Sequence, residues 1–239
     1  MKTQQSYLNN SYIKEMGATV LAIKPEGQNR YRLLLDSTVF YPMGGGQPTD
    51  QGKLTHENWT GDVYQVMIKD GEVWHYANET VIPEVNWLVR GAINWERRYQ
   101  NMRRHSAGHL VDFALYQLGY SPKLLMPFKG DHGKKPFIMY RGTTDEDIKQ
   151  KLEDKTNELV GRSLKFTTEF QPFEKLQQEA IYLQPGLPNN KPLRTLRLET
   201  VGAVADGGTQ VGSTKEVGEV KITAIEKKEG NTVIYYQIG

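Results

Sequence analysis

The 239-residue sequence contains no cysteine. Disulfide bonds, a thiol nucleophile and thiolate metal ligands are therefore excluded, and a reducing compartment is the natural setting. Long hydrophobic runs are also missing, since no stretch approaches the roughly 20 apolar residues that a membrane-spanning helix needs. Residues 1–17 lack the hydrophobic core of a signal peptide. These absences predict a cytoplasmic protein that makes no contact with a membrane.

An excess of either charge is also lacking. The 30 basic and 28 acidic residues give a net charge of +2, which excludes a protein that coats nucleic acid indiscriminately. The basic residues are nevertheless clustered, and either solvent or a phosphate backbone is the natural partner of such clusters. The residues that we predict to contact such a phosphate backbone are Arg97, Arg98, Arg103, Arg104, Lys134 and Lys135.

The order of β-prone and helical segments indicates the fold class. Between residues 19 and 94, short β-prone runs alternate with turn-forming residues, as in a small barrel or a curled antiparallel sheet. Helical and strand-like segments then alternate to the end of the sequence. We therefore predict an α+β protein with a glycine-rich β-barrel domain at residues 1–94. A two-layer α/β domain with a largely antiparallel sheet is predicted at residues 95–239.

Three consecutive glycines occur within the barrel region, at positions 44–46. Glycines weaken helices and strands, so a run of three indicates a local requirement of the backbone. It predicts either a tight turn that a ligand or another chain approaches closely, or an ordinary hairpin connection. It is not a phosphate-binding P-loop, because no Gly-Lys-Ser/Thr follows.

A helix expected over residues 97–119 carries His105 and His109, with Asn94 as a suitable N-cap. Side chains four residues apart lie on one helical face, with Cβ atoms roughly 5–6 Å apart. The two imidazoles can therefore reach one metal ion, or form a hydrogen-bonded pair. A metalloprotease helix is not indicated, because the intervening Ser-Ala-Gly lacks the glutamate base.

Three segments in this order resemble a known family. They are Thr-Val-Phe-Tyr-Pro-Met-Gly-Gly-Gly-Gln-Pro-Thr-Asp at 38–50, Arg-Arg-Tyr-Gln-Asn-Met-Arg-Arg-His-Ser-Ala-Gly-His-Leu at 97–110, and Asp-Gly-Gly-Thr-Gln-Val at 206–211. Together they resemble the editing domain of alanyl- and threonyl-tRNA synthetases, and in particular the free-standing AlaX trans-editing proteins of medium length. The resemblance covers nearly the whole chain and implies hydrolysis of mischarged tRNA(Ala), chiefly Ser-tRNA(Ala) and also Gly-tRNA(Ala). ATP is not expected to be needed.

The resemblance also implies a zinc site of two helical histidines, a cysteine and a further histidine. His105 and His109 match the helical pair, whereas Asp206 takes the place of the cysteine and Gln210 that of the last histidine. An aspartate oxygen is a good zinc ligand, whereas a glutamine is a weak one. The expected cofactor is therefore a divalent metal, zinc above all, on His105, His109 and Asp206, with Gln210 as a doubtful fourth ligand.

Three states of this site follow from the altered ligands. A metal with a water in the open position, a metal-free pocket that orients water, and an inactive pocket that still binds tRNA all agree with the sequence. No Ser-His-Asp or Cys-His set is evident, so a bound water is the expected attacking group. A metal-dependent hydrolase of another small ester is the remaining alternative function.

The resemblance further implies which residues recognise the amino acid. Thr38 is expected to meet the serine hydroxyl, or else simply to fill a strand with a β-branched side chain. The loop residues Gly45, Gly46 and Gln47 are expected to approach the same pocket. A site that hydrogen-bonds a hydroxyl discriminates strongly against alanine, which lacks it.

Overall fold

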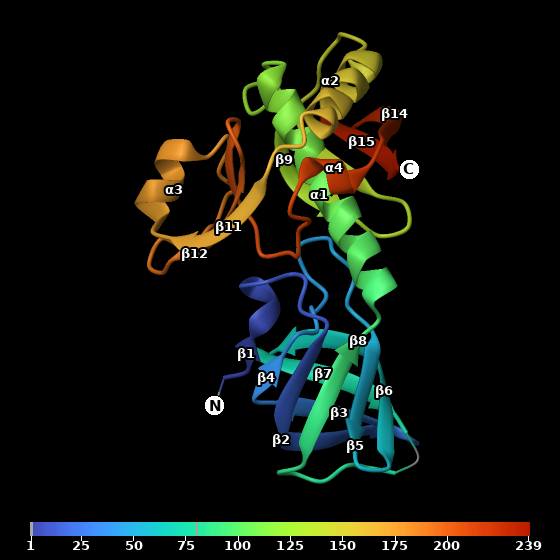
Figure 1. Ribbon diagram of the computed structural model, residues 1–239. Coiled ribbons are helices and arrows are strands. Elements are labelled where there is room, and N and C mark those ends of the chain that lie inside the picture. The colour runs from blue at the N-terminus through green and yellow to red at the C-terminus, as the bar shows by residue number, and fades with distance from the viewer. Residues whose placement is uncertain (1, 80) are drawn as a thin grey trace. The chain divides into compact units, whose positions relative to one another are not determined.

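The computed structural model describes residues 2–79 and 81–239. They form two compact units, divided between Gln100 and Asn101. The predicted α+β class is confirmed, because a closed antiparallel barrel occupies the first unit and helices and antiparallel sheets make up the second (Figure 1). Within the described part of the chain, no helix is both long and apolar enough to cross a membrane.

Six strands close the barrel of the first unit. In the order in which they pair, these strands are β2 (Glu15–Gly27), β3 (Arg30–Leu35), β7 (Glu72–Asn78), β6 (Trp59–Lys69), β5 (Gly52–His56) and β8 (Leu88–Ile93). Outside the barrel, the short strands β1 (Gln4–Gln5) and β4 (Ser37–Thr38) pair in parallel, and a 3-10 helix, η1, covers Ser6–Leu8.

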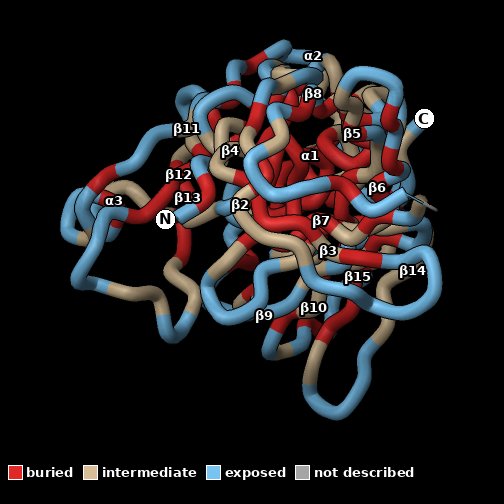
Figure 2. The backbone as a smooth tube through the Cα atoms, turned by 90° about the horizontal axis from the view of Figure 1, so that it is seen from below, coloured by how far each residue is buried: buried red, intermediate tan, exposed pale blue. Residues whose placement is uncertain are grey.

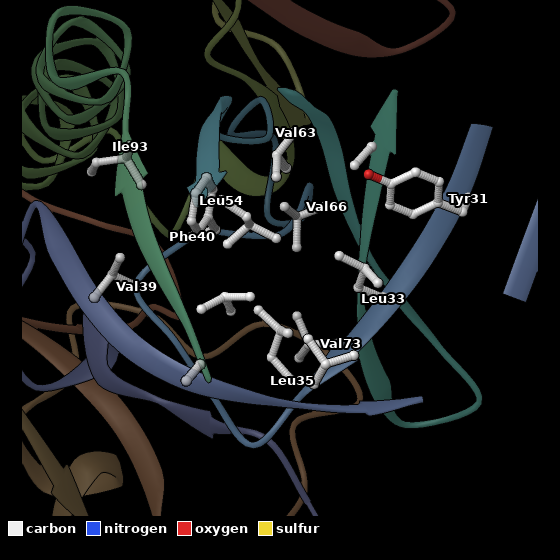
Figure 3. Packing of buried hydrophobic residues seen from close by; sticks show 14 of the residues in the cluster. Tyr31, Leu33, Leu35, Val39, Phe40, Leu54, Val63, Val66, Val73 and Ile93 are labelled. Carbon is white, nitrogen blue, oxygen red and sulfur yellow. The ribbon is translucent and has the colours of Figure 1, made fainter. Parts of the chain in front are cut away.

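Alternating side chains of these strands fill the barrel interior (Figure 3). Leu33, Leu54 and Phe40 are fully buried there. Two glycines make room for the Phe40 ring, because a Cβ at Gly52 or Gly91 would lie 2.9 or 3.1 Å from its carbon atoms. Glycine is thus required in β5 and β8 by close packing rather than by a turn.

Arg98 and Asp50 form an ion pair inside the first unit, and neither side chain is exposed. The Nε atom of Arg98 lies 3.1 and 2.9 Å from the two carboxylate oxygens. Its Nη atoms donate to the carbonyl oxygens of Ser11 (2.9 Å) and Val39 (2.6 Å). Burial raises the pKa of Asp50, and Arg98 opposes that shift. Arg98 therefore connects three segments of the unit to the start of helix α1.

The second unit contains two antiparallel sheets. One has the strand order β14 (Val220–Lys228), β15 (Asn231–Ile238), β10 (Phe137–Arg141), β9 (Met126–Asp131), and the other β11 (Phe166–Gln171), β12 (Leu193–Leu198), β13 (Gly202–Ala205). Besides most of α1, the unit contains helices α2 (Lys149–Gly161), α3 (Phe173–Glu179) and α4 (Thr214–Val217). Asn157 of α2 bonds both backbone groups of Val220, and this pairing seats α2 against β14.

Helix α1 covers Trp95–Gln117 and carries the two histidines. As predicted, the Asn94 side chain caps it, accepting a hydrogen bond from the amide of Arg97 (3.0 Å). Gly119 follows the helix with a φ of +81°, a conformation that favours glycine. The part of α1 within the second unit is buried almost all round (Figure 2). A helix buried on all sides is held by specific contacts with its neighbours, and several of these form the site.

Some element boundaries differ from the prediction. The apolar spacing of residues 144–160 predicts one helix, but α2 begins at Lys149. The side chains of Thr144 and Asp147 accept hydrogen bonds from the amides two residues ahead, and this favours turns over a helix. Strands β5 and β9 were not predicted, because their sequences are rich in glycine, lysine and proline.

Candidate metal site

The side chains of His105, His109 and Asp206 converge in the second unit, and their candidate ligand atoms all lie within 4.8 Å of one another. One carboxylate oxygen of Asp206, Oδ1, lies 3.4 Å from Nε2 of His105 and 3.5 Å from Nε2 of His109. The two imidazole rings are stacked, with centroids 5.0 Å apart. All three side chains are at least nine-tenths buried.

The turn after β13 fixes the orientation of Asp206. Its Oδ1 atom accepts a hydrogen bond from the amide of Gly208 (3.0 Å), which closes a tight turn. Its Oδ2 atom accepts hydrogen bonds from Gln210 Nε2 (2.9 Å) and Arg194 Nη1 (3.3 Å). The second oxygen is therefore occupied, and Oδ1 is the one that faces the histidines. Gln210, a doubtful ligand in the prediction, thus contacts Asp206 directly.

The pKa values of the two histidines are shifted in opposite directions. Burial lowers the pKa of His105 to about 4, although Asp206 opposes this. Burial also lowers the pKa of His109, but the carboxylates of Asp112 and Asp206 outweigh it and raise the value to about 9. Burial alone would raise the pKa of Asp206, yet both imidazoles and Arg194 bring it well below its usual range. A proton must therefore leave His109 before both imidazoles can bind a metal.

This donor set fits a divalent metal ion. Ligand atoms about 2.0–2.1 Å from a tetrahedral zinc ion lie about 3.3–3.4 Å from one another. The distances from Oδ1 to the two Nε2 atoms, 3.4 and 3.5 Å, are close to that spacing. Neither ring nitrogen of His109 has a hydrogen-bond partner among the described residues, although both are buried. Two imidazoles and a carboxylate leave a fourth position for water, as in catalytic zinc sites.

His132 lies beside the site and was missed by the sequence analysis. Its ring stacks on His105 with a centroid distance of 4.3 Å, and its Nδ1 lies 2.6 Å from the hydroxyl of Tyr236. That hydroxyl donates to the carbonyl oxygen of Arg104 on α1 (2.9 Å). Burial lowers the pKa of His132 well below its usual value. His132 therefore packs as a neutral ring that limits the movement of His105.

Comparison with known proteins places the chain in a family. The family model for class II tRNA synthetases of the alanyl type, "tRNA synthetases class II (A)", matches residues 9–97. An alanine–tRNA ligase of Halobacterium salinarum is 32% identical over 235 residues, which are 95% of this chain and 25% of the ligase. The chain thus spans about a quarter of that relative.

Two free-standing editing proteins match as well. The alanyl-tRNA editing protein AlaX-L of Pyrococcus horikoshii is 29% identical over 231 residues, which are 95% of this chain and 56% of AlaX-L. The alanyl-tRNA editing protein AlaX-M of Saccharolobus solfataricus is 32% identical over 249 residues, with 99% of both chains covered. The chain belongs to the AlaX family. The AlaX resemblance drawn from the sequence is thereby confirmed.

The AlaX resemblance implied that Thr38 recognises serine, and the structure places this residue in the interior of the first unit. Its side chain is fully buried, and its hydroxyl lies 2.7 Å from Nε2 of His75. The same oxygen accepts a hydrogen bond from the amide of Phe40 (3.0 Å). Burial lowers the pKa of His75 to about 4, so this imidazole is neutral. Thr38 thus takes part in a buried hydrogen-bond chain.

Thr38→Val tests the specificity role against this structural role. Because the substitution leaves His75 without its hydroxyl partner, we expect a loss of about 1–3 kcal/mol in the free energy of unfolding. We expect the ratio of deacylation rates on Ser-tRNA(Ala) and Ala-tRNA(Ala) to stay unchanged, since the hydroxyl is already bonded. Thr38→Ser, which keeps the hydroxyl, is the control. A ratio that falls in Thr38→Val and is preserved in Thr38→Ser would instead establish the role in serine recognition.

The three consecutive glycines of the AlaX motif form a tight hairpin turn. Gly45 and Gly46 have φ values of +55° and +78°, and the backbones of Gly44 and Gln47 bond each other in both directions. Two central residues with positive φ are the requirement of a type I′ turn. The Gln47 side chain is buried within the first unit. A contact between this loop and a substrate remains a prediction.

The predicted tRNA-binding residues differ in their exposure. Arg98 is buried in its ion pair, and Arg97 donates through Nε to the carbonyl oxygen of Thr49 (2.9 Å). Arg103 donates to the carbonyl oxygens of Glu216 and Val217 and is half-buried. Lys134 and Lys135 are exposed, and Arg104 is half-buried. The exposed cations most available to a phosphate are therefore Lys134 and Lys135.

Proposed function

We propose that this AlaX-type protein hydrolyses the ester bond of mischarged Ser-tRNA(Ala) in trans, with Gly-tRNA(Ala) as a second substrate. The observation that carries the proposal is the buried group of His105, His109 and Asp206, with its ligand atoms within 4.8 Å. Membership of the family supports the same conclusion, because the two free-standing relatives are alanyl-tRNA editing proteins.

The three residues have distinct tasks in this proposal. His105 and His109 would hold a divalent metal through their Nε2 atoms, and Asp206 would hold it through Oδ1. A metal bound there lowers the pKa of a water and polarises the ester carbonyl. Arg194 helps the two imidazoles to lower the pKa of Asp206, and Arg194 and Gln210 hold its other oxygen in place. The protein supplies position and charge, which suffice for an ester that is already activated.

A covalent route through the nearest hydroxyl is not favoured. Ser106 lies between the two histidines in sequence, but its hydroxyl donates to Gln210 Oε1 (2.6 Å). The Ser106 hydroxyl oxygen itself accepts a hydrogen bond from the amide of Val211 (3.1 Å). Both contacts hold the loop after β13 against α1, and none of the described residues is positioned as a base to activate the hydroxyl. Water is therefore the proposed attacking group.

Contacts with tRNA are proposed from charge. Lys134 and Lys135 precede β10 and are exposed, so phosphate groups can reach them. Arg104 lies one residue before His105 and is half-buried. Since such contacts release counterions, binding of tRNA(Ala) should weaken steeply as salt is raised.

Deacylation with and without a chelator tests the function. Full-length protein is given Ser-tRNA(Ala) and Ala-tRNA(Ala), and release of the amino acid is measured before and after metal removal. We expect deacylation of Ser-tRNA(Ala) at least tenfold faster than that of Ala-tRNA(Ala). Chelation should abolish this activity and zinc should restore it, because His105, His109 and Asp206 need the ion to activate water. His105→Ala should resemble the chelated protein.

Each other result has a definite meaning. Turnover that a chelator leaves intact would replace the metal mechanism with one in which the polar groups orient water directly. Salt-sensitive tRNA binding without turnover would identify a non-catalytic tRNA-binding protein. Chelator-sensitive hydrolysis of simple esters, with Ser-tRNA(Ala) left intact, would identify a hydrolase of another substrate.

A further inference from the structure

Asp112 is a buried carboxylate on α1, three residues after His109. It is 4% exposed, and both of its oxygens accept hydrogen bonds from tyrosines. Tyr140 of β10 donates to Oδ1 (2.7 Å), and Tyr182, which follows α3, donates to Oδ2 (2.9 Å). Burial and the Asp112 charge raise the pKa of both tyrosines well above the usual value, so both remain donors.

Such a group needs a functional or structural reason. Among the described residues, no lysine or arginine forms an ion pair with Asp112, and a buried carboxylate is costly without one. The basic side chain that faces it is His109, whose Nδ1 lies 3.7 Å from Oδ2. The spacing of three residues on one helix makes this proximity a direct result of helix geometry.

The imidazole of His109 therefore lies between two carboxylates. Its Nδ1 faces Asp112, and its Nε2 lies 3.5 Å from Oδ1 of Asp206. The ring is buried and stacks on His105, so its orientation is constrained from a third side. A metal-binding histidine commonly donates its second N–H to a carboxylate, which fixes the tautomer and the ring orientation.

We infer that Asp112 is the positioning residue of His109. Its carboxylate selects the tautomer with the proton on Nδ1 and thereby presents the Nε2 lone pair to the side of Asp206. Tyr140 and Tyr182 hold the carboxylate at that position from β10 and from the segment after α3. The inference rests on the proposed metal site, but it concerns metal binding and does not require the substrate to be tRNA.

Zinc affinity of the full-length protein tests the inference. In Asp112→Asn the shape is kept, but an amide no longer specifies a single tautomer. We expect its zinc affinity, measured by competition with a chelator, to fall about 10- to 100-fold. In zinc-loaded wild-type protein, nitrogen-15 spectra of the histidines should show one imidazole protonated at Nδ1, and this signal should be lost in Asp112→Asn.

A matched control separates positioning from general destabilisation. Thr156 is also fully buried in the second unit, where its hydroxyl donates to the carbonyl oxygen of Leu152 (2.7 Å). Thr156→Val removes a buried hydrogen bond away from the histidines, so the zinc affinity should not change. Should Asp112→Asn fail to fold, the variants Tyr182→Phe and Tyr140→Phe decide the matter, with an expected severalfold loss of affinity in each.

Several results would overturn the inference. They are wild-type zinc affinity in folded Asp112→Asn, wild-type affinity in both tyrosine variants, and an absence of zinc binding in the wild type. Zinc binding that weakens in Asp112→Asn, in a protein that does not deacylate Ser-tRNA(Ala), would keep the inference and refute the proposed function. If the zinc-binding protein deacylates Ser-tRNA(Ala) and its zinc affinity is unchanged in Asp112→Asn, the proposed function would stand and the inference would be refuted.

Discussion

Gly208→Ala is expected to abolish metal binding and deacylation, although it adds one methyl group. A Cβ at position 208 would lie 2.1 Å from Cε1 and 2.3 Å from Nδ1 of His105. Real atoms do not approach so closely, and His105 cannot move aside freely, because His132 stacks on its ring. The same Cβ would lie 3.2 Å from Oδ1 of Asp206. Two of the three ligands would therefore be displaced together.

The neighbouring glycine provides the control. A Cβ at Gly207 would meet no atom within 4 Å, so Gly207→Ala should keep wild-type zinc affinity and activity. Zinc affinity by chelator competition and deacylation of Ser-tRNA(Ala) are the measurements, with circular dichroism to verify folding. For Gly208→Ala we expect an affinity loss of more than about 100-fold, larger than that from loss of a neighbouring hydrogen bond. Normal zinc binding by Gly208→Ala would exclude the proposed ligand geometry.

Arg98→Met is expected to destabilise the first unit by about 3–5 kcal/mol, because it leaves Asp50 buried without its cation. Such a loss is large against the roughly 5–15 kcal/mol that holds a typical domain together. The carbonyl oxygens of Ser11 and Val39 would lose their donors at the same time. All four tryptophans of the chain, at positions 59, 74, 87 and 95, belong to this unit. Tryptophan fluorescence during urea unfolding therefore measures the change.

Neutralising the remaining charge should restore part of the loss. Asp50→Asn in the Arg98→Met background keeps the acceptor for the Tyr41 amide and removes the buried charge. Burial raises the pKa of Asp50, so in Arg98→Met the folded state takes up a proton at a higher pH than the unfolded chain. The penalty should therefore shrink as the pH falls below 7.

Arg97→Met, which removes one half-buried hydrogen bond, should lose no more than about 1.5 kcal/mol. Equal stability of Arg98→Met and wild type would contradict the assigned role.

The sequence predicts the elements whose signals are local. The α1 helix has an N-cap at Asn94, a stop at Gly119 and apolar residues at helical spacing between 110 and 118, and each is visible within a few residues. The barrel follows from short β-prone runs between turns. Strand β5, Gly52–His56, carries no such signal, because its conformation depends on pairing with β6 and β8.

The site was predictable only in part, for the same reason. The spacing of His105 and His109 places both on one helical face. By the same rule, Asp112, three residues after His109, is expected beside it. Asp206 entered the prediction through family resemblance alone, because it is about a hundred residues away along the chain. Arg194 and His132 come from separate strands and their flanks, and no pattern in the sequence connects them to α1.

Arg98 illustrates how charge patterns mislead. A basic run at the start of a helix resembles a phosphate-binding surface, and Arg98 belongs to such a run. Its partner, Asp50, is 48 residues earlier, so burial of the pair emerges only when the barrel closes. The sequence reveals the charge of a residue, whereas its exposure depends on tertiary structure.

The three candidate metal ligands lie on one turn of α1 and in the loop after β13. These two segments are far apart in an unfolded chain. A divalent ion would therefore bind the native second unit and have little affinity for the denatured chain. By mass action, zinc at a hundred times its dissociation constant would add about 2.7 kcal/mol to the stability of that unit. Thermal melting of the protein should thus depend on the zinc concentration, and the abundance of the protein would rise and fall with the supply of zinc in the cell.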